Sequence, residues 1–274
     1  MRGLPVFAVL LTVLLAVGLS ACSHDAQYSS GQAYLDRYQY QPAGTAAGDG
    51  KTADRDGVVT GRDIDAAVAR AAAIEPILRF PARIGLARIE NGRLSVPGEA
   101  EGDAWLDLAE SLGGEVGEFV LIDPLIAGLA YDAAPDLHPR SDRWTVHDIV
   151  AMIRVGAASR HVDAVFIYEV AATANSTQNP LSITDFTIVL GSLVPSRSVK
   201  AIGQANGILI DVRNGYPYGT AQATADEKAV ATWFGSHDKR TSLTEVAKQQ
   251  AAVALTGEVR GMIEKLKVKM AVAH

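Results

Sequence analysis

Residues 208–225 read ILIDVRNGYPYGTAQATA, and this stretch decides the fold. Apolar side chains recur at every second position from 208 to 212, which is the period of a β-strand. Asn214-Gly215 follows, and this pair favours a two-residue type I′ turn because both central positions need positive φ. Residues 216–225 then alternate again. The stretch therefore predicts an antiparallel hairpin.

The second strand of this hairpin has two unlike faces. Tyr216 and Tyr218 begin a row of larger residues, and the row between them holds Pro, Gly and Ala. We expect another element to pack closely on the small row. Pro217 has no amide donor, so it should lie at a sheet edge or pair on one side only. Asp211, beside the turn, should face solvent or cap the turn.

Working outward, the period of the apolar residues predicts further strands and helices. The strands are expected at 83–90, 117–122 and 163–170, and the last of these is apolar enough to be covered on both faces. Helices are expected around 64–71, 105–112 and 146–159, and from 242 onward. Thr145 with Asp148, and Ser242 with Glu245, match the capping-box pattern.

This order predicts an α/β (α+β) fold in which helices pack on a mixed β-sheet of about five strands, with a C-terminal hairpin and helix. We expect one periplasmic α/β domain over residues 58–274. The apolar stretch 181–193 is too short to span a bilayer, so it should be a buried helix or strand.

The first residues resemble a secretory signal. Arg2 precedes an uncharged apolar run, and Leu19-Ser20-Ala21-Cys22 resembles a bacterial lipobox. We expect residues 1–21 to be a signal peptide cleaved between Ala21 and Cys22. The Cys22 sulfur would carry diacylglycerol, so the chain would be anchored in the bilayer by two or three acyl chains, palmitate or similar. Ser23 in place of Asp favours the outer membrane, with the domain facing the periplasm.

Residues 22–57 are rich in Ser, Gly, Gln, Asp and Tyr and show no sustained period. Such a composition predicts a flexible tether between membrane and domain. Four tyrosines leave a second possibility open, which is that part of this segment docks on the domain or on a partner: Tyr28, Tyr34, Tyr38 and Tyr40.

Composition excludes several classes of protein. A hydrophobic fraction of 48% with 20% charged residues is that of a globular protein. The net charge of −6 argues against a nucleic-acid partner, which would need a basic surface. One cysteine excludes an intrachain disulfide framework and a cysteine-based zinc ribbon.

No catalytic or cofactor motif is recognisable in the sequence. Phosphate-binding loops, nucleophile elbows and paired metal-binding histidines are missing, so we expect no cofactor and no metal. A metal site would have to combine distant His138, His147 and His237. An acidic cluster should stabilise a helix start instead of acting in catalysis: Glu99, Glu101, Asp103 and Asp107. Glu169 either sits in water at a strand end or marks a buried polar site.

The lipobox, DAVFIYEV at 163–170 and DVRNGYPYGTAQATAD at 211–226 resemble the rhombotarget-type bacterial lipoproteins, over roughly residues 80–260. That family is named for a presumed link to rhomboid-type sorting proteases and not for an activity. The chain ends in KLKVKMAVAH, which departs from a carboxy-terminal sorting signal. More distantly, the two strands are similar to periplasmic α/β domains of the curli-secretion lipoprotein and of the TolB amino-terminal domain. This resemblance implies binding to other envelope proteins.

Three hypotheses of function remain. The first is a non-enzymatic envelope lipoprotein that binds or assembles with a protein partner, through an exposed apolar or tyrosine-rich patch such as Tyr216 and Tyr218. The second is an oligomer-forming transport component that self-associates through a sheet edge or the segment 181–195. The third is a hydrolase of envelope polymers, which would need a deep pocket holding acids or histidines.

Overall fold

A computed structural model describes residues 23–37, 61–114, 116–134, 145–178, 197–231 and 236–273. Seven strands and six helices follow one another in it: β1 (Ser23–Ala26), α2 (Gly31–Arg37), α3 (Gly61–Ala72), β2 (Ala82–Glu90), β3 (Arg93–Ser95), α4 (Glu99–Leu112), β4 (Gly117–Leu121), α5 (Pro124–Asp132), α6 (Val146–Ser159), β5 (Ala164–Gln178), β6 (Arg197–Asp211), β7 (Pro217–Ala231) and α7 (Ser236–Ala273).

The strands form one mixed sheet in the order β1-β7-β6-β5-β2-β3, and β4 also pairs with β2. β2 runs parallel to β4 and β5, and the other neighbours are antiparallel. The predicted mixed α/β fold is confirmed. The sequence patterns found five of the seven strands. They missed β1 and β3, which have four and three residues and are too short to show a period.

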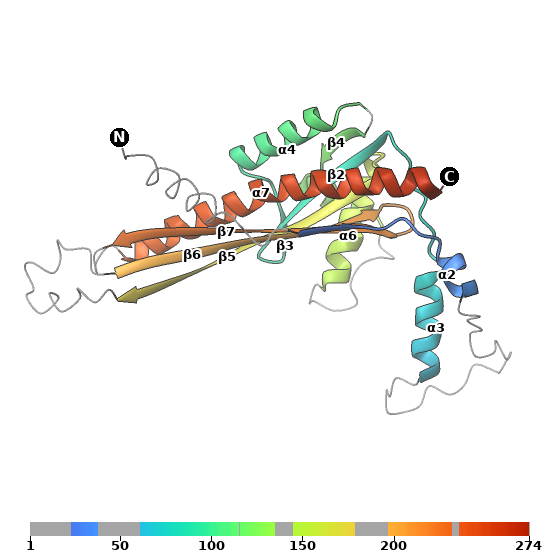
Figure 1. The fold of residues 1–274 in the computed structure, drawn as a ribbon, viewed down its shortest axis with the longest axis horizontal. Coiled ribbons are helices and arrows are strands. Elements are labelled where there is room, and N and C mark those ends of the chain that lie inside the picture. The colour runs from blue at the N-terminus through green and yellow to red at the C-terminus, as the bar shows by residue number, and fades with distance from the viewer. Residues whose placement is uncertain are drawn as a thin grey trace, which may run out of the picture.

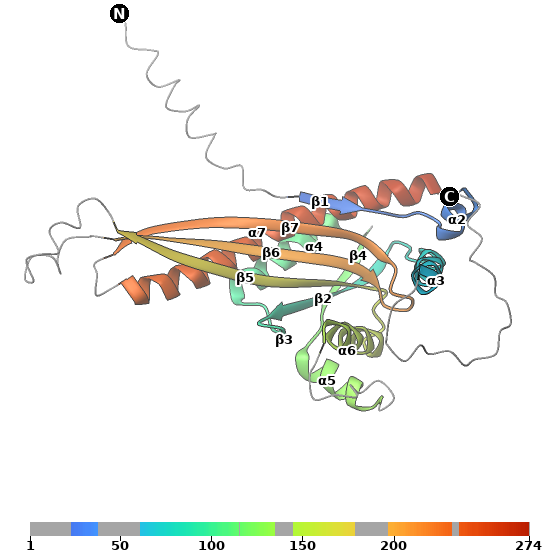
Figure 2. The ribbon, with the colours of Figure 1, turned by 90° about the horizontal axis from the view of Figure 1, so that it is seen from below.

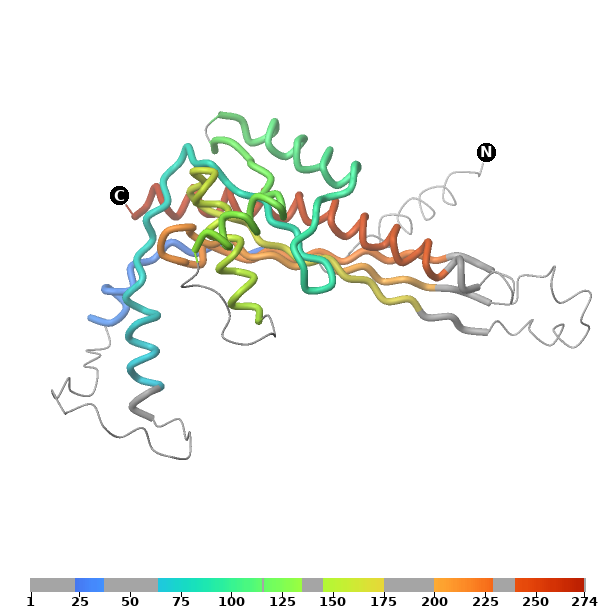
Figure 3. The backbone as a smooth tube through the Cα atoms, turned by 180° about the vertical axis from the view of Figure 1, so that it is seen from behind, coloured from blue at the N-terminus to red at the C-terminus, as the bar shows by residue number. Residues whose placement is uncertain are grey.

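Helices cover both faces of the sheet. α4 and α7 lie on one face and α6 on the other (Figure 1), where α5 packs beside α6 (Figure 2). β5 is buried by both layers over its first half, as its unbroken apolar sequence predicted: Ala164, Phe166 and Tyr168 join the α4/α7 core, and Val165 and Ile167 join the α5/α6 core. Beyond that half, β5, β6 and β7 run on as a three-stranded extension (Figure 3).

The small row of β7 receives α7, as expected. Ala221 and Ala223 are 2% and 1% exposed. A Cβ on Gly219 would come within 3.0 Å of the Met262 side chain, and a Cβ on Gly203 within 2.0 Å of the Ala247 carbonyl oxygen. Side chains this small let the helix axis approach the sheet more closely than larger ones would allow. Pro217 pairs with β6 but not with β1, which confirms its expected one-sided pairing.

α7 begins earlier than predicted. Ser242 and Glu245 lie inside the helix, so the second capping box is wrong, whereas the Thr145–Asp148 box is present with both of its hydrogen bonds. The turn before Ser242 already contacts the strand extension, because Arg240 Nη2 donates to the Ala174 carbonyl of β5 at 3.0 Å. Leu243 and Ala247 then pack on buried Ala201 of β6.

The turn after β6 is longer than the predicted two residues. Gly215 has φ +77°, but Asn214 is not among the residues with positive φ, so a type I′ turn is wrong. Asp211 is fully buried, and its Oδ1 accepts the amide of Arg213 at 2.8 Å. This side-chain bond bends the backbone before Asn214 is reached. Asp211 does cap the turn, as one alternative predicted, but it does not face solvent.

Part of the predicted tether is folded. β1 pairs with β7 from Ser23↔Gln222 to Ala26↔Gly219, and α2 follows. The tether prediction is therefore wrong for residues 23–37, and the alternative that tyrosines dock on the domain is right for Tyr28, which stacks on Tyr218. Residues 38–60, with Tyr38 and Tyr40, lie outside the described residues, as does the segment 181–195.

The sequence patterns predict no helix over α5. Asp123 is its N-cap and accepts the amides of Leu125 and Ile126, and Pro124 occupies the first helical position. An Asp-Pro pair can begin a helix in this way, because proline at the first helical position needs no amide donor. On α3, Ile64 and Val68 are 54% and 42% exposed, so its apolar stripe is not part of the core.

The α7 contact gives a test of the fold. Gly203→Ala places a methyl group against the α7 backbone, so we expect a loss of about 1–3 kcal/mol of stability. Gly257→Ala lies on α7 at a position with open space around it, so we expect the protein to gain about 0.5–1 kcal/mol of stability, because alanine is the better helix former. Urea unfolding followed by circular dichroism measures both. Equal midpoints for the two variants would contradict the packing described here.

Candidate functional site

The predicted site residues do not come together. Ala21 and Cys22 lie outside the described residues, so cleavage and acylation remain predictions. Tyr216 and Tyr218 are only 6% and 0% exposed. The prediction that these two tyrosines form an exposed partner-binding face is therefore wrong, because both belong to the core.

The segment after β1 covers these tyrosines. The Ser29 amide donates to Tyr216 Oη at 3.1 Å, and Tyr216 Oη donates to the Ser29 carbonyl at 3.1 Å. The Tyr28 ring stacks on Tyr218 at a centroid distance of 6.3 Å. Residues 27–30 show no period in the sequence, so their covering role could not be recognised from the pattern.

Tyr218 also joins the hairpin to the chain before β2. Its hydroxyl donates to Asp211 Oδ2 at 2.8 Å and accepts the amides of Ile77 and Leu78 at 3.1 and 2.8 Å. Burial, and then the hydrogen bond to Asp211, raise the pKa of Tyr218 well above its usual value. A hydroxyl held protonated with all three partners in place is a structural group and not an acid–base catalyst.

In the acidic cluster near residue 100, Glu101 is buried and the other three side chains are exposed. Glu101 is 2% exposed and meets Arg88 of β2, whose Nε donates to Glu101 Oε2 at 3.1 Å. Tyr168 Oη donates to Glu101 Oε1 at 2.6 Å and accepts from Trp105 Nε1 at 3.2 Å. Burial, and then the charge of Glu101, raise the pKa of Tyr168. This network joins α4 to the sheet.

The network continues to α7. Arg88 Nη1 donates to Glu90 at 2.8 Å, and Lys248 Nζ donates to the same carboxylate at 2.9 Å. These two hydrogen bonds lower the pKa of Glu90. Glu101, Trp105 and Leu108 share one helical face at spacings of four and three. That spacing is the sequence signal from which the burial of Glu101 could have been found.

The other candidates are simpler. Glu169 is exposed, which decides between its two alternatives in favour of water at the strand surface. Within the described ranges no group of three His, Cys, Asp or Glu side chains could hold a metal ion. His138 lies outside those ranges, and the side chain of His237 is not described either. No helix in the described part of the chain is long and apolar enough to cross a membrane.

An apolar groove of about 340 Å³ lies between α4 and β4. Leu86, Phe119 and Leu121 line it from the sheet, and Trp105, Leu106 and Ala109 line it from the helix. Leu106 is 65% exposed and Val96, at one end of the groove, is 54% exposed. These are large apolar side chains gathered in one concave place, which marks a binding surface more strongly than single exposed residues do.

The groove borders an open strand edge. β4 pairs with β2 on one side, and no other described strand pairs with it. The Ile122 amide donates inward to the Leu86 carbonyl at 2.9 Å. Because peptide groups alternate in direction along a strand, those of Phe119 and Leu121 point outward from the sheet. The same two residues therefore offer side chains to the groove and backbone groups to an added strand.

The rim of the groove is acidic. Glu99 and Asp103 line it one turn apart on α4, and both are exposed. Neither has a cationic partner among the residues that the structure describes. α4 itself carries five acidic residues and no basic one. The negative electrostatic potential of these carboxylates would favour a partner that carries Lys or Arg beside its apolar residues.

Comparisons with known proteins were made by sequence and by structure. No protein-family model matches the chain, and no curated protein does so by sequence. The resemblance to rhombotarget-type lipoproteins thus stays a prediction.

Among solved structures, a PelC dodecamer from Paraburkholderia phytofirmans is similar at 11% identity and a TM-score of 0.29, over 66% of this chain and 86% of that one. Lipoprotein GNA1162 from Neisseria meningitidis is similar at 13% identity and 0.29, over 61% and 99%. The LpoB C-terminal domain from Salmonella enterica gives 11% and 0.22, over 56% and 83%. At these scores the likeness says nothing about the groove.

The Glu101 network can be tested by stability. Glu101→Leu leaves the buried Arg88 without one of its carboxylates, so we expect a loss of about 3–5 kcal/mol. Arg88→Met combined with Glu101→Leu should recover much of this loss, because no buried charge is then left unpaired. Asp107→Ala, at an exposed position of the same helix, should change stability by less than about 0.5 kcal/mol. Urea midpoints measure all three, and a harmless Glu101→Leu would contradict the network.

Proposed function

We propose that this chain is a non-enzymatic envelope lipoprotein that binds a protein partner in the periplasm. In this proposal Cys22 is acylated after cleavage at Ala21 and anchors the domain, in the outer membrane. The partner is an extended segment that lies in the groove between α4 and β4. The observation that carries the proposal is the open edge of β4 beside an apolar groove.

The groove fits strand addition. A segment that pairs with the outward peptide groups of Phe119 and Leu121 would gain main-chain hydrogen bonds from β4. Every second side chain of that segment would point toward Leu106 and Leu121, which are 65% and 38% exposed when the groove is empty. A lysine or arginine in this same groove-facing row would meet Glu99 and Asp103 at the rim, because both carboxylates lie on the helix that covers this face. The partner is therefore an extended polypeptide whose groove-facing row combines apolar residues with a basic one.

A hydrolase is less well supported. Two carboxylates of a glycosidase stand on opposite sides of the bond that they cleave. Glu99 and Asp103 stand on the same helix, one turn apart, and both face water. The residues that line the groove include no serine, cysteine, histidine or lysine: Leu86, Val96, Pro97, Glu99, Gly102, Asp103, Trp105, Leu106, Ala109, Phe119 and Leu121.

Self-association is the second candidate, and the sheet favours it at another place. β1 pairs only with Gly219–Gln222, so β7 from Ala223 onward has no described neighbour on its outer side. β5 likewise has no described neighbour opposite β6 beyond Glu169. Exposed edges of this length favour pairing between copies. Light scattering of the purified lipoprotein in detergent would give the mass of such an oligomer, and a monomeric mass would exclude it.

Synthetic peptides test the groove. An eight-residue peptide with Lys, Val, Val and Lys at every second position and Thr between them should bind at least tenfold more tightly than the same peptide with Glu in place of Lys, about 1.4 kcal/mol, because the rim is acidic. Leu106→Gln with Leu121→Gln should weaken binding of the lysine peptide at least tenfold, since both side chains line the groove. Isothermal titration calorimetry measures the dissociation constants.

The matched control is Leu125→Gln with Leu129→Gln. These leucines are 77% and 72% exposed on α5, on the other face of the sheet, and they do not line the groove. They should leave the affinity unchanged. Equal losses in the two double variants, or no preference between the peptides, would show that the partner does not bind as proposed.

A further inference from the structure

The strand that follows Cys22 is built into the sheet from its first residue. Ser23 pairs with Gln222 and Ala26 with Gly219, and β1 forms one edge of the sheet (Figure 2). Consecutive Cα atoms are about 3.8 Å apart, so the residue that would carry the lipid lies one peptide bond from the folded sheet. In the acylated protein no spacer would separate anchor and domain.

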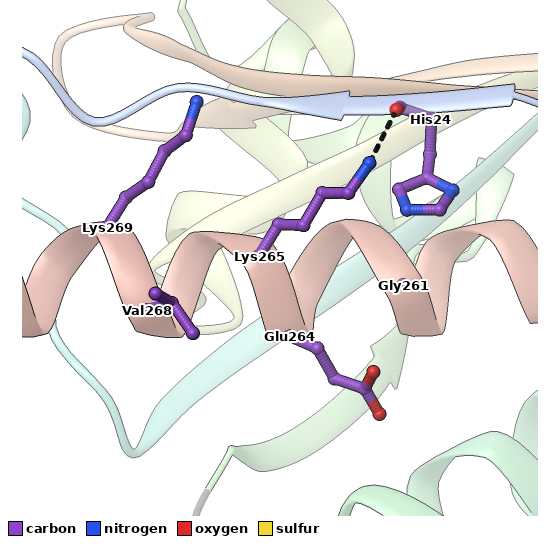
Figure 4. A pocket seen from close by; sticks show the side chains of 6 residues that line it. All are labelled: His24, Gly261, Glu264, Lys265, Val268 and Lys269. Atoms are coloured by element: carbon purple, nitrogen blue, oxygen red, sulfur yellow. Dashed lines mark hydrogen bonds between the residues drawn. The ribbon is translucent and has the colours of Figure 1, made fainter.

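Side chains of α7 hold β1 in this place. His24 Nδ1 lies 2.7 Å from Glu258 Oε2. Lys265 Nζ donates to the His24 carbonyl at 3.3 Å (Figure 4), and Lys269 Nζ donates to the Ala26 carbonyl. Two backbone carbonyls and one imidazole of β1 are thus fixed by one helix, which limits the freedom of the chain beside Cys22.

Glycines leave room for this strand. A Cβ on Gly261 would come within 2.5 Å of the His24 ring, and a Cβ on Gly219 within 2.3 Å of the Asp25 carbonyl oxygen. Gly261 of α7 and Gly219 of β7 therefore leave the space that β1 occupies. This close fit indicates that β1 is an integral part of the folded domain.

From this arrangement we infer that the β1 edge, together with the C-terminal half of α7, faces the bilayer in which Cys22 is anchored. The inference rests on the proposed acylation of Cys22. A flexible tether of 35 residues would let the domain move about 30 Å from the membrane. Without such a tether the acyl chains hold this edge at the lipid headgroups.

The surface at this edge has the side chains for such a position. A shallow depression here is lined by His24, Gly261, Glu264, Lys265, Val268 and Lys269 (Figure 4). Val268 is 66% exposed, and Val272 one turn further is 83% exposed. The exposed valines suit the boundary between headgroups and acyl chains, where apolar side chains can be buried, while the Lys265 and Lys269 ammonium groups stay with the β1 carbonyls.

The inference places the groove away from the membrane. β1 and β4 stand at opposite ends of the sheet, five strand intervals apart. At about 4.8 Å for each interval, the open edge of β4 lies about 24 Å from the anchored edge. The partner segment would then bind from the periplasmic space and not along the bilayer.

A quenching experiment tests this orientation on the full acylated chain. Acylation consumes the sulfur of Cys22, the only cysteine, so Val268→Cys and Leu125→Cys each give one free thiol for a fluorophore. Leu125 is 77% exposed on α5, far from β1, and is the matched control (Figure 2). The labelled proteins are placed in phosphatidylethanolamine–phosphatidylglycerol vesicles with a spin-labelled headgroup lipid. We expect at least twofold stronger quenching at position 268 than at position 125.

A spacer variant separates orientation from anchoring. Ten Gly/Ser residues inserted between Cys22 and Ser23 span about 17 Å, so the protein should stay on the vesicles but lose the difference between the two positions. Equal quenching at both positions without the spacer, or a difference that survives the spacer, would overturn the inference.

Two further measurements test the acylation of Cys22 independently of the orientation. Intact mass shows whether Cys22 carries lipid, and Cys22→Ser should leave the vesicles. An unmodified Cys22 would overturn both the anchor and this orientation. An acylated chain without the quenching difference would overturn the orientation alone.

Discussion

The close approach of α7 to β6 and β7 is the constraint on which the rest of the structure depends. The 38-residue helix α7 can lie close to β6 and β7 because the residues beneath it have small side chains or none, as at Gly203 and Gly219. Once α7 is seated, Lys248 reaches Glu90, and Lys265 and Lys269 reach the carbonyls of β1. The same helix thus joins β1, at one edge of the sheet, to β2 near the other edge, although these strands are far apart in sequence.

Buried polar groups then fix each edge. At one edge Tyr216 and Tyr218 hold the segment after β1 and the chain before β2 by hydrogen bonds to backbone groups. Near the other, Arg88 and Glu101 hold α4 over the sheet. Each of these side chains has a hydrogen-bond partner among the described residues. Together they hold β1 and the groove between α4 and β4 on one sheet.

The sequence predicted the elements with a strong period and missed the parts that depend on contacts distant in sequence. Alternation at 208–225 gave the hairpin and its small face, and the unbroken apolar run gave β5. The burial of Tyr216 and Tyr218 could not be read from the same alternation, because it is residues 27–29 that cover them. Glu101 shared the stripe of Trp105 and Leu108, yet its charge argued for a helix start. Its burial is explained by two partners on the sheet, Arg88 of β2 and the hydroxyl of Tyr168 of β5.

Sheet order separates β1, which follows the proposed anchor, from the groove beside β4. A strand added at the β7 edge occupies backbone groups that would otherwise attract another chain, so β1 closes part of that edge. β4 has no such cover among the described strands, and its open side carries exposed Leu121 and the acidic residues of α4 nearby. β1 thus covers part of one edge of the sheet, and β4 at the opposite side has no described strand beside it. If Cys22 is acylated as proposed, the anchored edge and the groove lie at opposite sides of the sheet, and this arrangement suits a membrane-bound docking protein.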